Sequence, residues 1–363
     1  MELVHQHGET DMRAFLIRGV SLERDNAEHE LLDRGICLPL PQRSLWAANA
    51  YPWKPLFLLI RDGSGQACGG VGIEKIRSRT MPGHSILRVR RFGENLSPQC
   101  CRFALEALTR LAHTEPRILR VQIHLFSLHR RGEMSKDFQE QGFLETSPPS
   151  SYRYTLIVDL TPTEDDIFAS FGKSARNRVR ESIKKSLQSA PLENPSFAAR
   201  IAEQQREAVH RTGGRVASLN WEGVLKMSRE HPGLSKVFGA FVGDEQQPES
   251  MRAFAWACNH GDHVEYHAAG STRTSDSRLP FGYSLVWAMI RWAKSAGAHW
   301  FDMGGVSLGE NGSALDGISD FKRFFSQDLV EVGAEWALEP HPLRAGIART
   351  VSRNAARVGR LLR

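Results

Sequence analysis

The chain has 363 residues, 41% of them hydrophobic and 24% charged, and a formal net charge of +6 at pH 7. This length suits two domains, and the composition is that of an ordinary soluble globular protein. The sequence contains no run of eighteen apolar residues, which excludes a membrane-spanning helix.

The N-terminus and the cysteines bear on the cellular compartment. Residues 1–15 lack the apolar core of a signal peptide. The five cysteines form an odd set without a C-x-x-C pair, which argues against a disulfide framework or a zinc site and fits a reducing compartment. We therefore expect a cytoplasmic protein.

The first half of the chain predicts a mixed α/β domain. Two strands flank a Gly-rich turn at residues 61–65, and a strand, a helix, a strand, a helix and a strand follow. These elements span residues 56–60, 67–76, 85–91, 103–111, 118–126, 133–141 and 152–160. The last strand is expected to close this domain at residue 160.

Two helices are expected to open the second half. Thr163 can cap the first, because acidic residues fill the turn that follows it. The second is a basic helix at residues 174–189, which Ser174 would cap. Its apolar stripe consists of Val179, Ile183 and Leu187. Arg176 falls on the apolar side of this helix, where its long side chain either reaches into a cleft or makes a structural contact.

Further helices are expected at residues 197–212, 219–229 and 281–296, and strands at 237–242, 251–258 and 264–268. Around the last of these strands lie His260, His263, Glu265 and His267, a set that suggests a metal site. Metal sites need three or more convergent ligands with supporting hydrogen bonds, and one hairpin seldom supplies both. We interpret these residues as part of a hairpin and expect no metal.

The stretch from residue 298 to 329 has the features of a functional site. Residues 300–303 form a short apolar strand, which Gly304 and Gly305 would end sharply. A polar, Gly-rich loop follows, and then Phe321-Lys322-Arg323-Phe324-Phe325 places two cations among three aromatic rings. Taken alone, these residues also fit a purely structural interpretation, in which they form a strand, a surface loop and a basic edge without a functional site.

The positive charge is concentrated at the C-terminal end. Residues 340–363 contain six arginines, no lysine and no acidic residue, so the preceding 339 residues are formally neutral. Apolar residues recur there at helical spacing. A basic amphipathic helix on an anionic membrane surface fits residues 342–363, as does a solvated terminal helix. The charge is no sign that the protein binds DNA.

Two motifs, in this order, resemble the signature of the Fem-type aminoacyltransferases, the FemABX-like proteins. Arg176-Asn177-Arg178-Val179-Arg180 with Lys184 is similar to the basic helix R-x-x-[IV]-R-x-x-x-K of that family. Asp302-Met303-Gly304-Gly305, followed by Phe321-Lys322-Arg323-Phe324-Phe325, is similar to its D-x-G-G … F-K-x-x-F segment. The resemblance covers residues 159–335 well and the first half in outline.

The resemblance implies an α/β (α+β) fold of two GNAT-like mixed-sheet domains in tandem, followed by a basic C-terminal helix. The domains would span residues 1–160 and 161–339, and the tail residues 340–363. GNAT enzymes bind the coenzyme A pyrophosphate on a Gly-containing turn that opens a helix. In the first domain, Glu94 and Pro98 make this turn a poor anion site. In the second, Arg278 and Gly282 remain, with fewer glycines than usual.

The resemblance also implies roles for individual residues. Lys322 would be the catalytic residue, together with Phe321 and Asp302, because a lysine in a partly dry setting acts strongly on a developing oxyanion. The substrate-binding residues would be Arg176, Arg180, Gly304, Gly305, Arg323 and Arg278. Burial would lower the pKa of Lys322 and a bound phosphate would raise it, so its protonation state stays open.

Three functions are compatible with these features. The resemblance implies transfer of an aminoacyl group from aminoacyl-tRNA to an amine of a peptidoglycan or other cell-envelope precursor, without a tightly bound cofactor, in the cytoplasm or at the inner face of the plasma membrane. The second hypothesis is an acyl-coenzyme A-dependent N-acyltransferase that acts on an envelope sugar or amino acid. The third is an inactive binding protein at the membrane surface.

Overall fold

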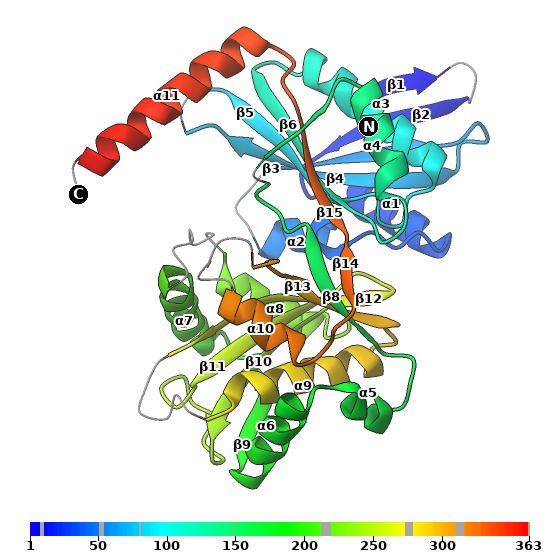
Figure 1. The fold of residues 1–363 in the computed structure, drawn as a ribbon. Helices are drawn as coiled ribbons and strands as arrows, with labels where there is room; N and C mark the ends of the chain where they lie inside the picture. The colour runs from blue at the N-terminus through cyan, green and yellow to red at the C-terminus, as the bar shows by residue number, and fades with distance from the viewer. Residues whose placement is uncertain are drawn as a thin grey trace. The chain divides into compact units, whose positions relative to one another are not determined.

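The computed structural model describes residues 1–7, 11–50, 54–79, 81–147, 149–211, 219–272, 279–309 and 316–361, with side chains of the last helix up to residue 351. The chain folds into two compact units (Figure 1). Unit 1 comprises Met1–Ala47, Pro52–Ser151 and Val332–Arg363, and unit 2 comprises Ala48–Tyr51 and Tyr152–Glu331.

Unit 1 is built on a mixed sheet whose described strands run in the order β1-β2-β3-β4-β5-β6-β15-β7. These strands are β1 (Glu2–His7), β2 (Met12–Arg18), β3 (Lys54–Arg61), β4 (Ala67–Arg77), β5 (Ser85–Phe92), β6 (Ile118–Phe126), β7 (Leu144–Glu145) and β15 (Gly333–Leu338). The helices are α1 (Leu22–Asp33), α2 (Ser44–Asn49), α3 (Pro98–Thr114), α4 (Arg131–Glu140) and α11 (Pro342–Leu361), with a short 3₁₀ turn at Leu40–Gln42.

The core of unit 1 forms where α3 and α4 pack on the sheet. Ser97 caps α3 by accepting a hydrogen bond from the Cys100 amide at 3.2 Å, and the apolar face of the helix, including Leu108, is buried. On α4, the ring of Phe138 stacks on that of Trp336 in β15, with centroids 5.0 Å apart. The strands and helices expected between residues 56 and 141 are confirmed, and the first fifty residues add elements that we had not predicted.

Unit 2 is built on a second mixed sheet, with the described strands in the order β14-β8-β13-β12-β11-β10-β9. These strands are β8 (Tyr154–Asp159), β9 (Leu187–Pro191), β10 (Ser235–Val242), β11 (Ala253–Asn259), β12 (His263–Ser271), β13 (Trp300–Gly305) and β14 (Leu329–Glu331). The helices are α5 (Glu164–Ser170), α6 (Lys173–Lys184), α7 (Ala198–Arg211), α8 (Trp221–Glu230), α9 (Phe281–Ser295) and α10 (Asp316–Arg323), with a 3₁₀ turn at Pro195–Phe197. Thr163 caps α5 as predicted.

Strands β8 and β15 differ from expectation in the sheets that they join. We expected the strand at residues 152–160 to close the first domain, but β8 pairs with β13 in unit 2, where Val158 lies opposite Phe301. In turn, residues 333–338, which we placed in the second domain without predicting a strand there, form β15 and pair with β6 in unit 1, where Trp336 lies opposite Ile123. The unit boundary therefore falls after Ser151 instead of residue 160, and Val332–Arg363 belongs to unit 1. Apolar alternation predicts a strand but does not select its partner.

The basic helix α6 also differs from the prediction. It begins at Lys173 after Gly172, so Ser174 lies inside the helix, and it ends at Lys184 instead of residue 189. Ser186 has φ of 51°, which stops the helix before β9. The buried face consists of Ala175, Val179 and Ser182, whereas Ile183 is 69% exposed. Residues spaced by four lie on one face, but only packing decides which face is covered.

Helix α11 is present, as the spacing of its apolar residues predicted. Ala345 and Ala348 are buried, while Leu343 and Ile347 are exposed. Arg349 forms an ion pair with Glu339, which lies between β15 and the helix. No helix in the described part of the chain is sufficiently long and apolar to span a membrane.

Candidate active site

The candidate site is organised around the glycine turn at the end of β13. Gly304 has φ of 71°, and a Cβ atom at this position would lie 2.9 Å from the carbonyl oxygen of Tyr266 on β12. A side chain is therefore excluded both by the backbone conformation and by the neighbouring strand. We expected the two glycines to end the strand after Met303, but β13 continues to Gly305, which pairs with Thr155 after a register shift, so this glycine turn is an irregularity inside the strand.

Asp302 is a fully buried carboxylate that holds this turn. It accepts hydrogen bonds from the Gly304 amide at 2.7 Å and from the Thr155 hydroxyl at 2.5 Å. The Tyr152 hydroxyl lies 2.8 Å from Asp302 Oδ2 and 3.1 Å from Glu265 Oε1. Because donors from β8 and from the turn converge on it, Asp302 fixes the backbone of the turn instead of facing open space.

Lys322 reaches the same turn from α10. Its ammonium donates a hydrogen bond to the carbonyl oxygen of Gly305 at 2.8 Å and lies 5.7 Å from the centre of the Tyr266 ring. The residue is only 7% exposed. Burial lowers the pKa of Lys322 to about 8, although the negative charges of Asp302 and Glu265 act in the opposite direction. The side chain is therefore mostly protonated at pH 7, but its pKa lies much closer to neutral pH than that of an ordinary lysine.

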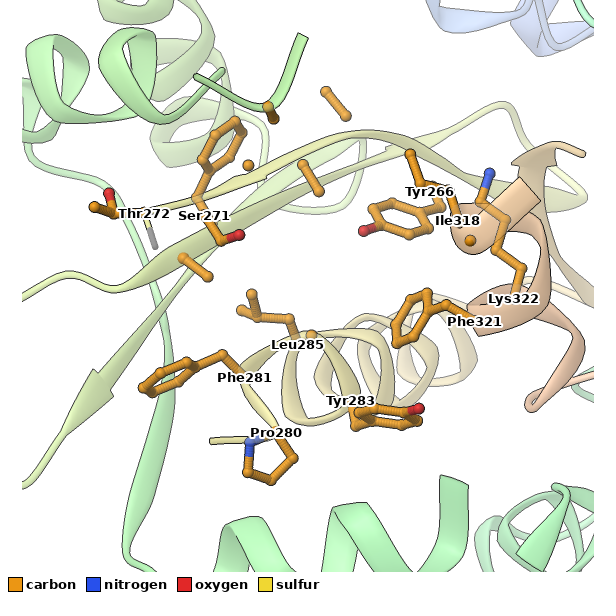
Figure 2. A pocket seen from close by; sticks show the side chains of 18 of the residues that line it. Tyr266, Ser271, Thr272, Pro280, Phe281, Tyr283, Leu285, Ile318, Phe321 and Lys322 are labelled. Carbon is orange, nitrogen blue, oxygen red and sulfur yellow. The ribbon is translucent and has the colours of Figure 1, made fainter. Parts of the chain in front are cut away.

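A cavity of about 750 Å³ opens beside Lys322 (Figure 2). It lies between β12, the beginning of α9, α10 and the end of α7. Figure 2 shows Lys322 and Phe321 on one side of this space and Phe281 and Thr272 on the other. Its size is in the range of small-molecule sites in proteins.

The cavity lies beside the point at which two parallel strands of unit 2 stop pairing. The parallel ladder of β12 with β13 extends from His263 to Glu265, and the following residues of β12 line the cavity. In unit 1 the corresponding parallel ladder, between β5 and β6, extends from Ser85 to Phe92. Where two parallel strands stop pairing, they diverge. The backbone donors and acceptors that no longer pair then face the space that opens between the strands. Unit 2 offers this arrangement at the Lys322 turn.

Comparisons with known proteins identify the fold. No protein-family model matches the chain, and no curated protein matches it. Among solved structures, FemX aligns with a TM-score of 0.71 and 14% identity, covering 92% of this chain and all of FemX. L-PGS from Bacillus licheniformis aligns with a TM-score of 0.53 and 13% identity, covering 93% and 97% of the two chains. A tandem GNAT protein from the clavulanic acid biosynthesis pathway aligns with a TM-score of 0.50 and 12% identity, covering 91% and 99%.

The chain has the tandem GNAT fold of FemX. The expected fold class, two GNAT-like units in one chain, is thus confirmed. At 12 to 14% identity these likenesses establish the fold and leave the reaction to be argued from the site.

Within this tandem GNAT fold, the residues of the second motif have different surroundings. Phe321 lines the cavity, with its ring centre 4.9 Å from that of Tyr283. Arg323 donates hydrogen bonds to the Ser307 carbonyl oxygen at 2.8 Å and to Asp320 at 3.0 Å, and it is not among the described residues that line the cavity. Arg278 lies outside the described residues.

The basic helix α6 makes contacts of its own. Arg176 donates two hydrogen bonds, to the carbonyl oxygens of Ala169 at 2.7 Å and Phe171 at 2.6 Å, and so ties α6 to the end of α5. The guanidinium carbon of Arg180 lies 5.3 Å from the centre of the Phe168 ring. Neither arginine belongs to the described lining of the cavity.

The histidines near β12 surround a carboxylate. Glu265 Oε2 lies 3.2 Å from His260 Nε2 and 3.0 Å from His267 Nδ1, while His263 stacks on Trp300 with ring centres 3.8 Å apart. Within the described ranges, no group of three or more His, Cys, Asp or Glu side chains is arranged to hold a metal ion. Glu265, whose charge acts on Lys322, is thus held by side chains of the same hairpin.

Four residues of the site were not predicted from the sequence. Tyr152 and Thr155 hold Asp302, Tyr266 lies beside the Lys322 ammonium, and Tyr283 packs on Phe321. Thr155 lies in β8 and Tyr152 two residues before this strand, while Tyr266 lies in β12 and Tyr283 in α9, all distant from the motif in the sequence. Tyr152 and Thr155 could have been predicted as site residues only if the pairing of β8 with β13 had been known.

Proposed function

We propose that this protein is a Fem-type N-acyltransferase, which transfers an aminoacyl or acyl group to an amine of a peptidoglycan or other cell-envelope precursor. The observation that carries the proposal is the buried Lys322 ammonium at one end of the unit 2 cavity. The motif resemblance and the tandem GNAT fold shared with FemX support the same reaction class.

In the proposed reaction the neutral amine of the acceptor attacks the carbonyl carbon of the donor. A C–N bond forms, the ester or thioester bond to the donor breaks, and the amine loses a proton to water or to the leaving group. The carbonyl oxygen becomes an oxyanion in between, and the Lys322 ammonium would stabilise it, because its charge is little screened in this buried place. Phe321 would shield the same region from water as part of the cavity wall.

Asp302 would act as a positioning residue in this reaction. It holds the Gly304 amide, while Gly305 accepts the Lys322 hydrogen bond, so the carboxylate aligns the turn that orients the ammonium. Its charge also keeps the pKa of Lys322 higher than burial alone would leave it. Gly304 and Gly305 would contribute to binding through this turn.

For the acceptor, we propose that its phosphate or carboxylate groups contact arginines of the basic helix, of the second motif and of the segment before α9. The candidates are Arg176, Arg180, Arg278 and Arg323. A planar guanidinium suits these groups because it can donate two parallel hydrogen bonds. Through the C-terminal helix, the protein would work in the cytoplasm at the inner face of the plasma membrane.

The donor is either aminoacyl-tRNA or acyl-coenzyme A, and neither would be a tightly bound cofactor. Acyl-coenzyme A is the second candidate donor, and the edge of β12 beside the cavity supports it. Backbone groups at this edge can bind the amide-containing arm of coenzyme A. In unit 1, Glu94 of the corresponding turn pairs with Arg91, and Pro98 opens α3 without an amide donor. This supports a single donor site, in unit 2.

Transfer assays test the proposal. Purified protein is incubated with envelope-precursor amines and either radiolabelled aminoacyl-tRNA or labelled acyl-coenzyme A, and the product is identified by mass spectrometry. We expect a labelled amide with one of the two donors and none with the Lys322→Met variant. Binding of a precursor without transfer from either donor would support the inactive binding protein instead.

A further inference from the structure

The cavity beside Lys322 is mostly apolar along its length. Large apolar side chains and small residues share its walls. The large ones are Phe254, Leu279, Phe281, Leu285, Ile318 and Phe321, and the small ones include Ala208, Ala253, Ala268, Ala269 and Gly270. Small residues keep the space open, so its apolar part extends well beyond the region that a reacting carbonyl would occupy.

The charge of the lining is positive. Among the lining residues that the structure describes, the lysine and arginine side chains are Lys322 and Arg211, and carboxylates are absent. Arg211 donates to the carbonyl oxygen of Ser271 at 3.1 Å. Both cations are partly offset from behind, because Glu207 lies 4.0 Å from Arg211 and the negative charges of Asp302 and Glu265 act on Lys322. A ligand with an ammonium group would nevertheless find no carboxylate to pair with among the described lining residues, which is unfavourable in an apolar setting. A carbonyl or carboxylate oxygen at Lys322 would instead gain a charge-assisted hydrogen bond.

From this lining we infer that the cavity takes an extended, uncharged apolar acyl chain, with its carbonyl group at Lys322. The transferred group would then be a medium- or long-chain acyl group, not a glycyl, alanyl or lysyl group. The inference rests on the proposed function and names the class of donor for the same site. A small acyl group would leave the partly exposed walls at Ala268, Ala269 and Ile318 in contact with water, so it would not gain the stabilisation that burial of apolar surface provides.

Chain length is the quantity to measure. Each buried methylene group strengthens binding about fourfold, until the chain reaches the end of the cavity. Isothermal titration calorimetry of the full-length protein with acetate, butyrate, hexanoate and octanoate measures this directly. We expect affinity to rise along the series, and octylammonium to bind at least tenfold more weakly than octanoate. Equal affinities along the series, or octylammonium binding as tightly as octanoate, would overturn the inference.

Two variants locate the bound chain. Ala269 lines the cavity and is partly exposed, so phenylalanine at this position would fill the space. We expect Ala269→Phe to abolish the gain from hexanoate to octanoate while acetate binding is unchanged. Ala199→Phe, on the exposed side of α7, is the matched control and should bind like the wild type. Lys322→Met should weaken octanoate binding but not octanol binding. If Ala269→Phe binds octanoate as the wild type does, the chain lies elsewhere and the inference is wrong.

The outcomes separate this inference from the proposed function. Length-dependent binding of octanoate without transfer from any acyl donor would retain the inference and remove the enzyme assignment. Transfer from glycyl- or alanyl-tRNA, without chain-length dependence, would retain the enzyme and remove the inference. Displacement of octanoate by adenosine would assign the cavity to the carrier portion of the donor, which also contradicts the inference.

Discussion

Lys322 is a buried lysine whose ammonium donates to the Gly305 carbonyl oxygen at the edge of a cavity. Loss of one well-placed electrostatic donor typically costs about 100- to 1000-fold in rate. We expect Lys322→Met to fold normally and lose transfer activity on this scale, measured as kcat with the correct donor and acceptor. Arg323→Met is the matched control for kcat, since Arg323 contacts Ser307 and Asp320: a loss of acceptor contacts would raise KM for the acceptor, while kcat should stay near that of the wild type. Near-normal turnover of Lys322→Met would remove the residue from the mechanism.

The same lysine should cost the protein stability. Its pKa is about 8 in the folded protein against 10.5 as the ordinary value, so between these pH values the unfolded chain binds more protons and stability rises with pH. Below pH 8 both states are protonated and the whole penalty, about 3 kcal/mol, is present. We expect Lys322→Met to raise the free energy of unfolding at pH 7, with a difference from the wild type that shrinks between pH 8 and 10.5.

Denaturant unfolding at several pH values measures this difference. The lost hydrogen bond to Gly305 reduces the gain by about 1 kcal/mol, so an increase of about 2 kcal/mol is the expected result at pH 7. Arg323 is one-third exposed, and Arg323→Met should show no such pH dependence. A Lys322→Met protein less stable than the wild type at pH 7 would contradict the assigned cost of burial.

Substitutions in α6 test the proposed acceptor-binding role of its arginines. Arg176 donates to two carbonyl oxygens through one nitrogen, Nη1, whereas the exposed Arg178 pairs with Glu181. If Arg176 also contacts the acceptor, lysine cannot reproduce its planar geometry. We predict that Arg176→Lys raises KM for the acceptor several-fold more than Arg178→Lys does. Equal KM values together with a lower thermal midpoint for Arg176→Lys would mean that the residue only ties α6 to α5.

Substitutions in α11 test whether this helix binds an anionic membrane surface. Leu343 is 87% exposed and Ile347 57% exposed, one turn apart on a helix rich in arginine. Burial of such side chains in a lipid interface contributes about 1.5–3 kcal/mol each, and arginines add attraction to anionic lipids. We predict that Leu343→Glu with Ile347→Glu weakens binding to anionic vesicles more than tenfold in a sedimentation assay, and that salt weakens the wild type.

The matched control for this prediction is Leu32→Glu, at a position on α1 that is 53% exposed. It should bind vesicles as the wild type does. Equal binding of the double variant and the wild type would indicate that α11 is a solvated terminal helix.

For the whole molecule, the return of β15 to unit 1 is a consequence of topology that can be tested by truncation. A chain ending at residue 331 lacks β15, which lies between β6 and β7 and supplies Ala334, Trp336 and Leu338 to the core of unit 1. We expect unit 1 of this variant to be unfolded while unit 2 remains folded. Limited proteolysis followed by mass spectrometry should show cleavage throughout residues 1–47 and 52–151 and protection of residues 152–331.

A chain ending at residue 341 is the control, because it keeps β15 and loses only α11. Unit 1 should remain protected in this variant, with at most a modest loss of stability from Ala345 and Ala348. Protection of residues 1–151 in the shorter chain would show that β15 is dispensable for the fold of unit 1.

The sequence by itself determined much of the local structure. Apolar alternation and helical spacing predicted β3 to β6, α3 and α9, because side-chain periodicity follows directly from backbone geometry. The paired glycines after Asp302 predicted a break in regular strand geometry, since Gly304 adopts a backbone conformation that other residues avoid, although β13 continues to Gly305 instead of ending at Met303. The two motifs, through their resemblance to the Fem-type proteins, predicted the tandem GNAT fold.

Only the tertiary structure decided which strands pair and which charges are buried. Nothing in the pattern of β8 or β15 distinguishes one sheet from the other, because long-range pairing depends on the surface that each strand covers. Likewise, the resemblance singled out Lys322 for catalysis, but the order Phe321-Lys322-Arg323 does not show which cation is buried; packing buries Lys322 beside the Gly304 turn, while Arg323 donates to Ser307. The cavity has the same origin: it lies beside the end of the ladder of β12 with β13, and its walls come from five separate parts of the chain.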